Sequence, residues 1–313
     1  MKVALIHNAK FPVAGYGGTE RLVWWLARGL HERGAQVVLA CHPESDCPYA
    51  KIVPFNEAQN LALECDVLHF FNTPESTPSR PHLVTIGGNG KVGEKYSINT
   101  VFVSQNHAYR HGASAFVHNG VDPDDYIFES QKLGYLTFLA KASWSVKNVK
   151  GAIKVARATG KDLHIMGGSR PFWSRAKGIF WEGMVDGRVK AQWLAKSSGL
   201  LFPVLWHEPF GIAVVEALVS GTPVLCTPFG SLQELVNSEV GKICLSYAEM
   251  REAVSHLGSY SPERCRDWAL SKFHYLQMTD KYLSYYERVL RGETLNRILP
   301  QVTAPTGQLL DFY

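Results

Sequence analysis

The sequence lacks the signals that mark disulfide-stapled, zinc-binding or membrane-spanning proteins. Its six cysteines form no C-x-x-C pair, and several, such as Cys226 and Cys244, sit in apolar runs typical of buried free thiols in a reducing compartment. No apolar run approaches the ~18 residues of a membrane-spanning helix. The start, MKVALIHNAK, turns polar too soon for a signal peptide. We therefore expect a cytoplasmic protein.

A block of basic residues is also missing. The chain carries 32 Lys and Arg against 28 Asp and Glu among 313 residues, a net charge of +4. Nucleic-acid-binding proteins usually cluster their basic residues, so we expect no nucleic-acid partner. The mild excess fits anionic partners such as phosphates or a membrane surface, which leaves peripheral contact with the inner face of a membrane open.

What the sequence does contain is a repeated alternation of short apolar runs and helical patterns. KVALIHN is followed by a glycine loop at 14–20, a helical pattern in ERLVWWLARGLHERG and a second apolar run, AQVVLAC. Such a β-loop-α-β unit implies a parallel sheet. We expect further strands at KIVPF, DVLHFF, HLVTIGG, NTVFVSQ and SAFVHNG.

The alternation breaks near 121–126, VDPDDY, and then resumes. Strands are expected at YLTFLAK, DLHIMGG, GIFWEG, GLLFPV and TPVLCTPFG, and helices at VKGAIKVARATG, RVKAQWLAKSS and FGIAVVEALVSG. Helical sequence follows from Pro262 to about Leu299. We therefore predict an α/β fold of two doubly wound Rossmann-like domains facing across a cleft. Ligands of such sheets bind beyond the carboxyl ends of the strands.

The domains are predicted to span residues 1–125 and 126–274. The C-terminal helix, about 275–299, is expected to pack back on the first domain. Residues 300–313 contain Pro and Gly without a clear period, so an irregular tail is expected there.

The stretch 207–224, HEPFGIAVVEALVSGTPV, contains the most informative motif. Glu208 precedes a Pro-Phe-Gly turn at the mouth of a strand, and Glu216 lies about two turns into a helix expected to begin near Pro209. A carboxylate at each place is able to hold sugar hydroxyls, whereas the plainer interpretation is one solvated charge and one helix-dipole acid. The turn would offer unpaired N–H groups to a phosphate or sugar oxygen at Phe210, Gly211 and Ile212.

The loop 14–20, AGYGGTE, holds a similar position before the first helix. Gly17 and Gly18 would let the backbone approach a ligand closely, and Thr19 is expected to cap the helix and leave N–H groups for an anion. A plain tight turn is the alternative. The spacing is not the G-x-G-x-x-G of nicotinamide-binding proteins, so an oxidoreductase has only the parallel sheet in its favour.

His107 and His111 are four residues apart on a predicted short helix, a spacing that two metal ligands can have. No third ligand with suitable spacing is evident in the sequence. We therefore expect an exposed cationic helix face that includes Arg110.

EPFGIAVVEALVSGTPV resembles the signature of retaining glycosyltransferases of the GT-B fold, specifically family 4, in which the two acids form a Glu-x-seven-Glu pattern. GGTERLVWWLARGLHERGAQVVLA, VSQNHAYRHG, VHNGVDPDDY and TPFGSLQELV resemble other segments of the family in the same order, so the similarity spans about residues 1–245. The resemblance implies a metal-independent enzyme without a cofactor that moves a hexosyl group from a nucleotide-diphosphate sugar to an acceptor hydroxyl. The acceptor would be a saccharide, a lipid-linked molecule or a small molecule in glycan, glycolipid or glycoconjugate biosynthesis.

The family comparison also implies roles for individual residues. Glu208 would contact the donor sugar, and Glu216 would bind the ribose hydroxyls of the nucleotide. Gly17 and Gly18 would approach the donor diphosphate from the other domain. The backbone of the turn would hold sugar and phosphate oxygens at Phe210, Gly211 and Ile212.

Lys141 and Lys147 fall where the family has an Arg and a Lys that neutralise the departing diphosphate. The segment FLAKASWSVKNVKGA is one residue longer than the common pattern, so Lys150 is a rival for the second place. Lysine keeps the charge of arginine but loses its bidentate fork. Solvated surface lysines are the plain alternative.

His69, in DVLHFFNTP, falls where many members of the family have a histidine that contacts the donor sugar or the acceptor. It is therefore a catalytic candidate, although a histidine within a strand is more often a core residue. Phe71 and Gly87 stand where relatives often have further histidines. Together with Lys141, which stands where the family has an Arg, these departures motivate an alternative function, a non-catalytic protein that binds a nucleotide sugar.

Overall fold

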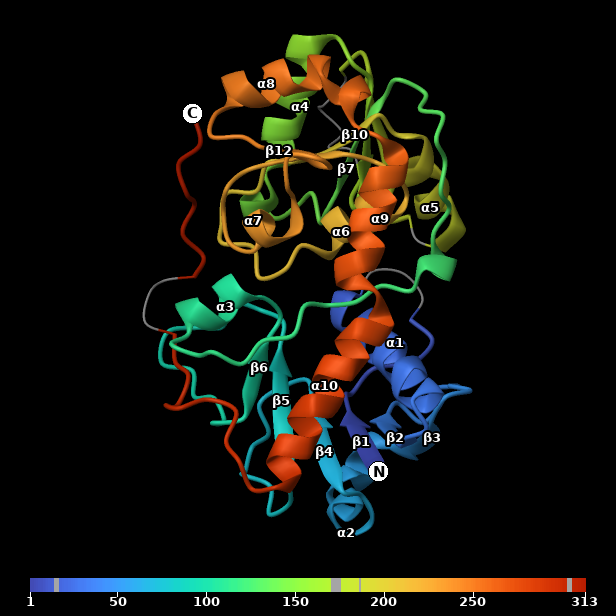
Figure 1. Ribbon diagram of the computed structural model, residues 1–313. Helices are drawn as coiled ribbons and strands as arrows, with labels where there is room; N and C mark the ends of the chain where they lie inside the picture. Colours follow the sequence, from blue (N-terminus) through green and yellow to red (C-terminus); the bar gives the residue numbers. More distant parts are fainter. Residues whose placement is uncertain (14–16, 170–175, 186, 303–305) are drawn as a thin grey trace. The chain divides into compact units, whose positions relative to one another are not determined.

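The computed structural model describes residues 1–13, 17–169, 176–185, 187–302 and 306–313 (Figure 1). The chain divides into two compact units. Unit 1 comprises residues 1–121 and 273–306, and unit 2 comprises residues 122–272 and 307–313. Each unit contains a six-stranded sheet in which the paired strands are parallel.

The sheet of unit 1 has the strand order β3-β2-β1-β4-β5-β6. From β1 the chain moves outward to β2 and β3 on one side, and then returns to build β4, β5 and β6 on the other. The strands are β1 (Lys2–Ile6), β2 (Gln36–Cys41), β3 (Lys51–Pro54), β4 (Val67–Phe70), β5 (His82–Ile86) and β6 (Thr100–Phe102), and the α-helices are α1 (Gly18–Glu32), α2 (Leu61–Glu64), α3 (Gln105–Arg110) and α10 (Tyr275–Leu290).

The sheet of unit 2 repeats this topology with the order β12-β11-β10-β7-β8-β9. Its strands are β7 (Leu136–Leu139), β8 (Leu163–Met166), β9 (Ile179–Gly183), β10 (Gly199–Phe202), β11 (Val224–Cys226) and β12 (Gly241–Ile243). Its α-helices are α4 (Val149–Thr159), α5 (Gly187–Lys196), α6 (Ile212–Val219), α7 (Leu232–Leu235), α8 (Tyr247–Ser255) and α9 (Pro262–Phe273). The predicted pair of doubly wound sheets is therefore confirmed.

Apolar burial explains why these segments form central strands. The strands β7 and β10 are buried along their whole length, as expected for parallel strands covered on both faces. The helix α1 buries Leu22, Leu26 and Leu30, one apolar stripe at helical spacing. All six cysteines are buried and unpaired with one another, which confirms their prediction as free thiols.

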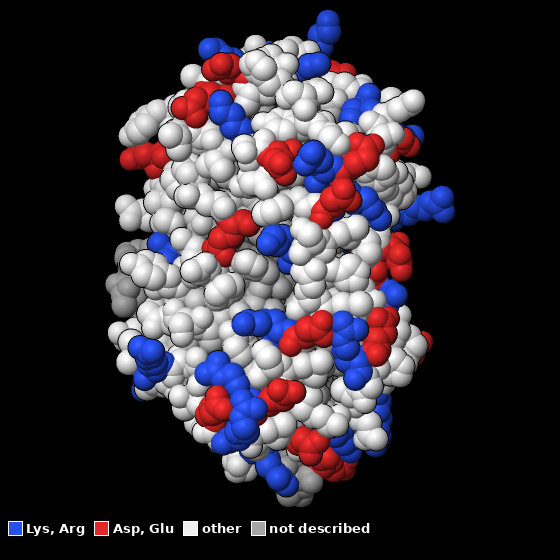
Figure 2. Space-filling view, viewed as in Figure 1, with Lys and Arg blue, Asp and Glu red and all other residues white. Residues whose placement is uncertain are grey.

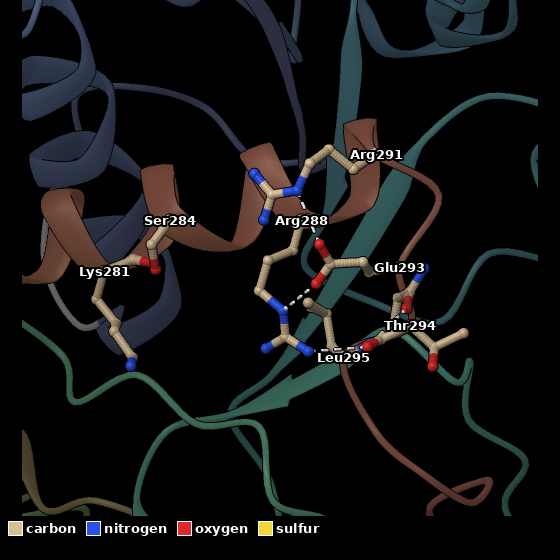
Figure 3. Close-up of polar contacts among 8 residues, drawn as sticks. Lys281, Ser284, Arg288, Arg291, Glu293, Thr294 and Leu295 are labelled. Atoms are coloured by element: carbon tan, nitrogen blue, oxygen red, sulfur yellow. Dashed lines mark hydrogen bonds and ion pairs between the residues drawn. The ribbon is translucent and has the colours of Figure 1, made fainter.

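The last long helix ends earlier than the sequence pattern predicted. The helical pattern was expected to continue to about Leu299, but α10 stops at Leu290. Gly292 follows with φ +78°, a left-handed conformation that commonly ends helices. Arg288 and Arg291 both donate to Glu293 across this turn, at 3.1 and 2.8 Å (Figure 3). Two ion pairs to Glu293 therefore span the turn at the point where the helix ends.

Beyond this turn, the side chain of Asn296 binds backbone groups of a segment that was predicted to be a strand. Its side-chain oxygen accepts from the backbone N–H groups of Ser114 and Ala115 at 2.9 and 3.0 Å, and its amide nitrogen donates to the carbonyls of Ile98 and Thr100. The segment SAFVHNG, expected as a strand, accordingly forms only an isolated bridge at Phe116. A buried side chain satisfies backbone groups that a strand ladder would otherwise pair.

The surface of the described part of the chain carries charges of both signs. On the face drawn in Figure 2, Lys and Arg side chains are interspersed with Asp and Glu. None of the helices in the described ranges combines the length and the apolar character needed to cross a bilayer.

Candidate active site

Two loops meet at the carboxyl ends of β7 and β10, the central neighbouring strands of unit 2. After β7 the chain moves outward to β8 and β9, and after β10 it moves the other way, to β11 and β12. This is the topological switch point, where doubly wound sheets bind their ligands. The backbone N–H of Leu205 donates to the carbonyl of Val146 at 2.8 Å, which joins the two loops directly.

A buried ion pair lies between these loops. The Lys147 ammonium, on the β7 loop, contacts both carboxylate oxygens of Glu208, on the β10 loop, at 2.9 and 2.7 Å. The indole N–H of Trp206 donates to the same carboxylate at 2.7 Å. Lys147 and Glu208 are only 8% and 6% exposed, so each charge depends on the other for compensation.

Asn148 fixes the position of Lys147. It has a left-handed backbone, φ +58°, and its side-chain oxygen accepts from Gly151 N at 3.0 Å, which caps α4. Its amide nitrogen donates to the carbonyl of Pro203 at 2.7 Å and to the Tyr247 hydroxyl at 2.8 Å. The sequence analysis missed this residue, although an Asn directly before a helical pattern is a recognisable cap.

The turn after Glu208 brings the amino end of α6 beside the ion pair. Gly211 has φ +88°, and a side chain there would also meet Glu208 Cγ at 3.3 Å, so this position requires glycine. The helix begins at Ile212 and not near Pro209 as predicted. Phe210 is buried, and its carbonyl accepts from the Ser231 hydroxyl at 2.6 Å, which fixes the turn.

Glu216 forms a second buried cluster. It lies four residues after Ile212, a little over one turn into α6 and not two as predicted. Its Oε1 accepts from the Lys190 ammonium of α5 at 2.5 Å and from the Tyr126 hydroxyl at 2.7 Å. All three side chains are buried. Neither partner was identified from the sequence, because Lys190 on α5 and Tyr126 in the segment before β7 reach α6 only through tertiary packing.

The two other lysines of the β7 region are placed differently from Lys147. Lys141 is exposed, with its ammonium 5.0 Å from the centre of the Trp144 ring. Lys150 is exposed on α4. Of the three lysines, Lys147 is the one that contacts Glu208.

The predicted glycine loop belongs to unit 1 and is described only in part, because residues 14–16 lie outside the described ranges. Gly17 precedes α1 in an extended conformation, and Gly18 is the first residue of the helix. Thr19 therefore lies inside the first turn, and the prediction that it caps the helix is wrong. An added side chain at Gly18 would meet nothing within 4 Å.

His69 is part of a buried hydrogen-bond network in unit 1. Its ring nitrogens contact the hydroxyls of Tyr286 and Thr85, each at 2.8 Å, and Thr85 also contacts the Tyr282 hydroxyl at 2.9 Å. The side chain is fully buried, and this burial lowers the pKa of His69 well below its usual value. These contacts favour the interpretation of His69 as a core residue.

His7 stands at the switch point of unit 1 and was missed by the sequence analysis. It directly follows β1, and Phe71 directly follows β4, with the two rings 5.9 Å apart. His7 Nε2 lies 3.7 Å from the Glu20 carboxylate, and the neighbouring His7 ring is the main cause that lowers the pKa of Glu20. The sequence did contain a signal for this residue, because a polar side chain directly after the first predicted strand lies at the edge of the sheet where ligands bind.

The prediction of an exposed helix face at His107 and His111 is wrong. Both imidazoles are buried against Phe102, at ring distances of 4.9 and 4.5 Å. His107 Nε2 contacts the carbonyl of Gly88 at 3.0 Å, and His111 contacts the carbonyls of His107 and Asn89. Within the described ranges, no three His, Cys, Asp or Glu residues gather into a group able to hold a metal.

The burial of His107 predicts a loss of stability in acid. Burial lowers the pKa of His107 from 6.5 to about 3. As the pH falls, the unfolded chain therefore protonates this imidazole at a higher pH than the folded chain does. The neutral His107 side chain contributes fully to the free energy of unfolding above pH 6.5, and this contribution is lost progressively between pH 6.5 and 3. The free energy of unfolding lost in this way is about 2 kcal/mol at pH 5. Urea unfolding at pH 7.5 and 5 should show a smaller acid loss in His107→Gln. An equal loss in both proteins would contradict this assignment.

Comparisons with known proteins agree with this architecture. Residues 134–259 match the family model described as glycosyl transferases group 1. An uncharacterized 41.2 kDa protein in the cps region of Klebsiella pneumoniae is 26% identical over 116 residues, 35% of this chain. The matched part spans about a third of that relative, 32% of its length.

Two solved structures illustrate the similarity of fold. AviGT4, a glycosyltransferase involved in avilamycin A biosynthesis, superimposes with a TM-score of 0.79 at 24% identity, covering 94% of this chain and 99% of AviGT4. HepE of Anabaena, solved with UDP and glucose, has a TM-score of 0.65 at 14% identity, covering 92% and 99% of the two chains. The chain therefore has the GT-B fold, and the region of its second unit at 134–259 is similar to group 1 glycosyl transferases.

Proposed function

We propose that this chain transfers a sugar from a nucleoside-diphosphate sugar to a hydroxyl of an acceptor, in the biosynthesis of a glycan or glycoconjugate. The main support for this proposal is the buried Lys147–Glu208 pair at the switch point of unit 2, beside the amino end of α6. A cation and a helix amino end together suit a phosphate, and a carboxylate suits sugar hydroxyls. The group 1 domain match and the UDP bound in the structure of HepE support this proposal.

The hard step is the departure of the diphosphate from the anomeric carbon. The bond between this carbon and the phosphate oxygen breaks, and its electron pair leaves with the diphosphate. Lys147 and the first N–H groups of α6 would stabilise the negative charge that grows there, with Lys141 adding a second cation from the same loop. Donors fixed before the reaction stabilise such charge without reorganising.

The two glutamates would hold the donor at two points. Glu208 would accept hydrogen bonds from the sugar hydroxyls once Lys147 turns toward the phosphate. Glu216 would bind the ribose hydroxyls through Oε2, because the bonds from Lys190 and Tyr126 engage Oε1. The turn formed by Phe210, Gly211 and Ile212 would supply backbone N–H groups between them.

We further propose that the configuration at the anomeric carbon is retained and that no metal or cofactor takes part. The acceptor oxygen would bond to the anomeric carbon on the face that the diphosphate leaves, and the acceptor proton would pass to the departing phosphate oxygen. Because that oxygen takes the proton, the step requires no side chain as a base.

A thermal-shift panel tests the proposed function. The diphosphates of uridine, guanosine and adenosine and their glucose conjugates are added to the full chain. One of the three families should stabilise the protein, by about 2.7 kcal/mol at 100 times Kd, or roughly 5 to 10 °C for a unit of this size. No stabilisation by any member of the panel would overturn the proposal.

A further inference from the structure

We infer that the Trp144 indole, with the edge-on Trp206 ring beside it, forms an aromatic platform that stacks against the sugar ring of the donor. The inference rests on the proposed function and deepens it, because it names side chains that would distinguish a nucleotide sugar from the nucleotide alone.

The first observation is the exposure of an indole at the switch point. Trp144 lies in the loop after β7, between Lys141 and Lys147, and is 46% exposed. A large aromatic side chain at the mouth of a site adds little to the core of the unit, and such residues are enriched where proteins recognise ligands.

The second observation is an alternation of ammonium and indole groups that leads to Glu208. The Lys141 ammonium lies 5.0 Å from the Trp144 ring, which meets the Trp206 ring edge-on at 6.3 Å. Trp206 in turn lies 4.8 Å from the Lys147 ammonium and donates its N–H to Glu208. The platform is therefore continuous with the residues assigned to the donor.

The chemistry of a sugar ring matches this arrangement. A hexose has one face of C–H groups and a rim of hydroxyls, so it needs an apolar surface beside hydrogen-bonding groups. The exposed Trp144 indole supplies the surface, and the carboxylate of Glu208 supplies acceptors for the hydroxyls. The neighbouring ammonium groups suit the diphosphate attached to the same ring.

The test compares binding of a nucleotide sugar with binding of its diphosphate. Affinities of UDP and UDP-glucose, or of whichever pair stabilises the chain in the thermal panel, are measured by calorimetry for the wild type, Trp144→Ala and Trp144→Phe. Phe180→Ala is the control, since Phe180 is a comparably exposed aromatic residue, 44%, on the outer strand β9 of the same unit.

We expect Trp144→Ala to weaken the nucleotide sugar about tenfold, which corresponds to ~1.4 kcal/mol, and to leave the diphosphate unchanged. Trp144→Phe should retain most of the affinity, and Phe180→Ala all of it. Equal weakening of both ligands would show that Trp144 contacts the nucleotide, and unchanged binding of both would show no contact; either result overturns the platform. Binding of neither ligand by the wild type would instead overturn the proposed function.

Discussion

Lys147→Ala is expected to lower the rate of sugar transfer by about 10²–10³-fold, the usual cost of removing one preorganised group from a developing negative charge. The loss should appear in kcat, because Lys147 is assigned to charge that forms as the diphosphate leaves. Lys147 contacts both carboxylate oxygens of Glu208, so Glu208→Gln should also lower turnover by orders of magnitude. Both effects are measured as initial rates with the donor found in the thermal panel.

Two controls separate chemistry from folding. Lys147→Arg keeps the charge and should restore part of the rate, whereas Lys150→Ala removes an exposed lysine of the same region and should leave it unchanged. Circular dichroism establishes that each variant is folded. Near-normal transfer by folded Lys147→Ala and Glu208→Gln would refute the assignment of both residues.

Lys190→Met is expected to destabilise unit 2 by about 3–5 kcal/mol. The Lys190 ammonium and the Glu216 carboxylate are both buried, and removing one partner leaves the other charge uncompensated. Urea unfolding of the full chain measures the effect at neutral pH.

An exposed pair in the same unit provides the control. Arg264 and Glu239 are 3.5 Å apart with 67% and 60% of their side chains exposed, so Arg264→Met should cost less than about 1 kcal/mol. The double variant Lys190→Met/Glu216→Met should recover much of the stability, because no buried charge remains. A loss in Lys190→Met no greater than in Arg264→Met would show that the buried pair contributes little.

The layered architecture could be predicted because it depends on local patterns. Short apolar runs alternate with helical stretches, and the order of these elements already implies parallel sheets. The prediction failed where a tertiary contact decides the local structure. SAFVHNG has the composition of a strand, but Asn296, from a distant part of the sequence, accepts from the N–H groups of Ser114 and Ala115, and pairing with β6 is limited to the bonds at Phe102. The apolar period of the last helix continues past Gly292, where the backbone turns.

The candidate site was predictable to the extent that it lies in one motif. Glu208 and Glu216 were found because the turn and the helix that carry them are contiguous in the sequence. Trp206, a partner of Glu208, was missed, as were Lys190 and Tyr126, the partners of Glu216, because a contact between side chains leaves no spacing in the sequence. Asn148 was missed although its place before a helical pattern marks it as a cap. The histidines show the same limit. His69 was singled out on resemblance and is buried among tyrosines, whereas His7 at the end of β1 was passed over.

A crystal structure of the chain grown with the best-binding nucleoside diphosphate tests the central claim most directly. The claim predicts phosphate oxygens within hydrogen-bond distance of Lys147 Nζ and of the first backbone N–H groups of α6, with the ribose hydroxyls on Glu216. A diphosphate bound away from the loops that follow β7 and β10 would contradict it.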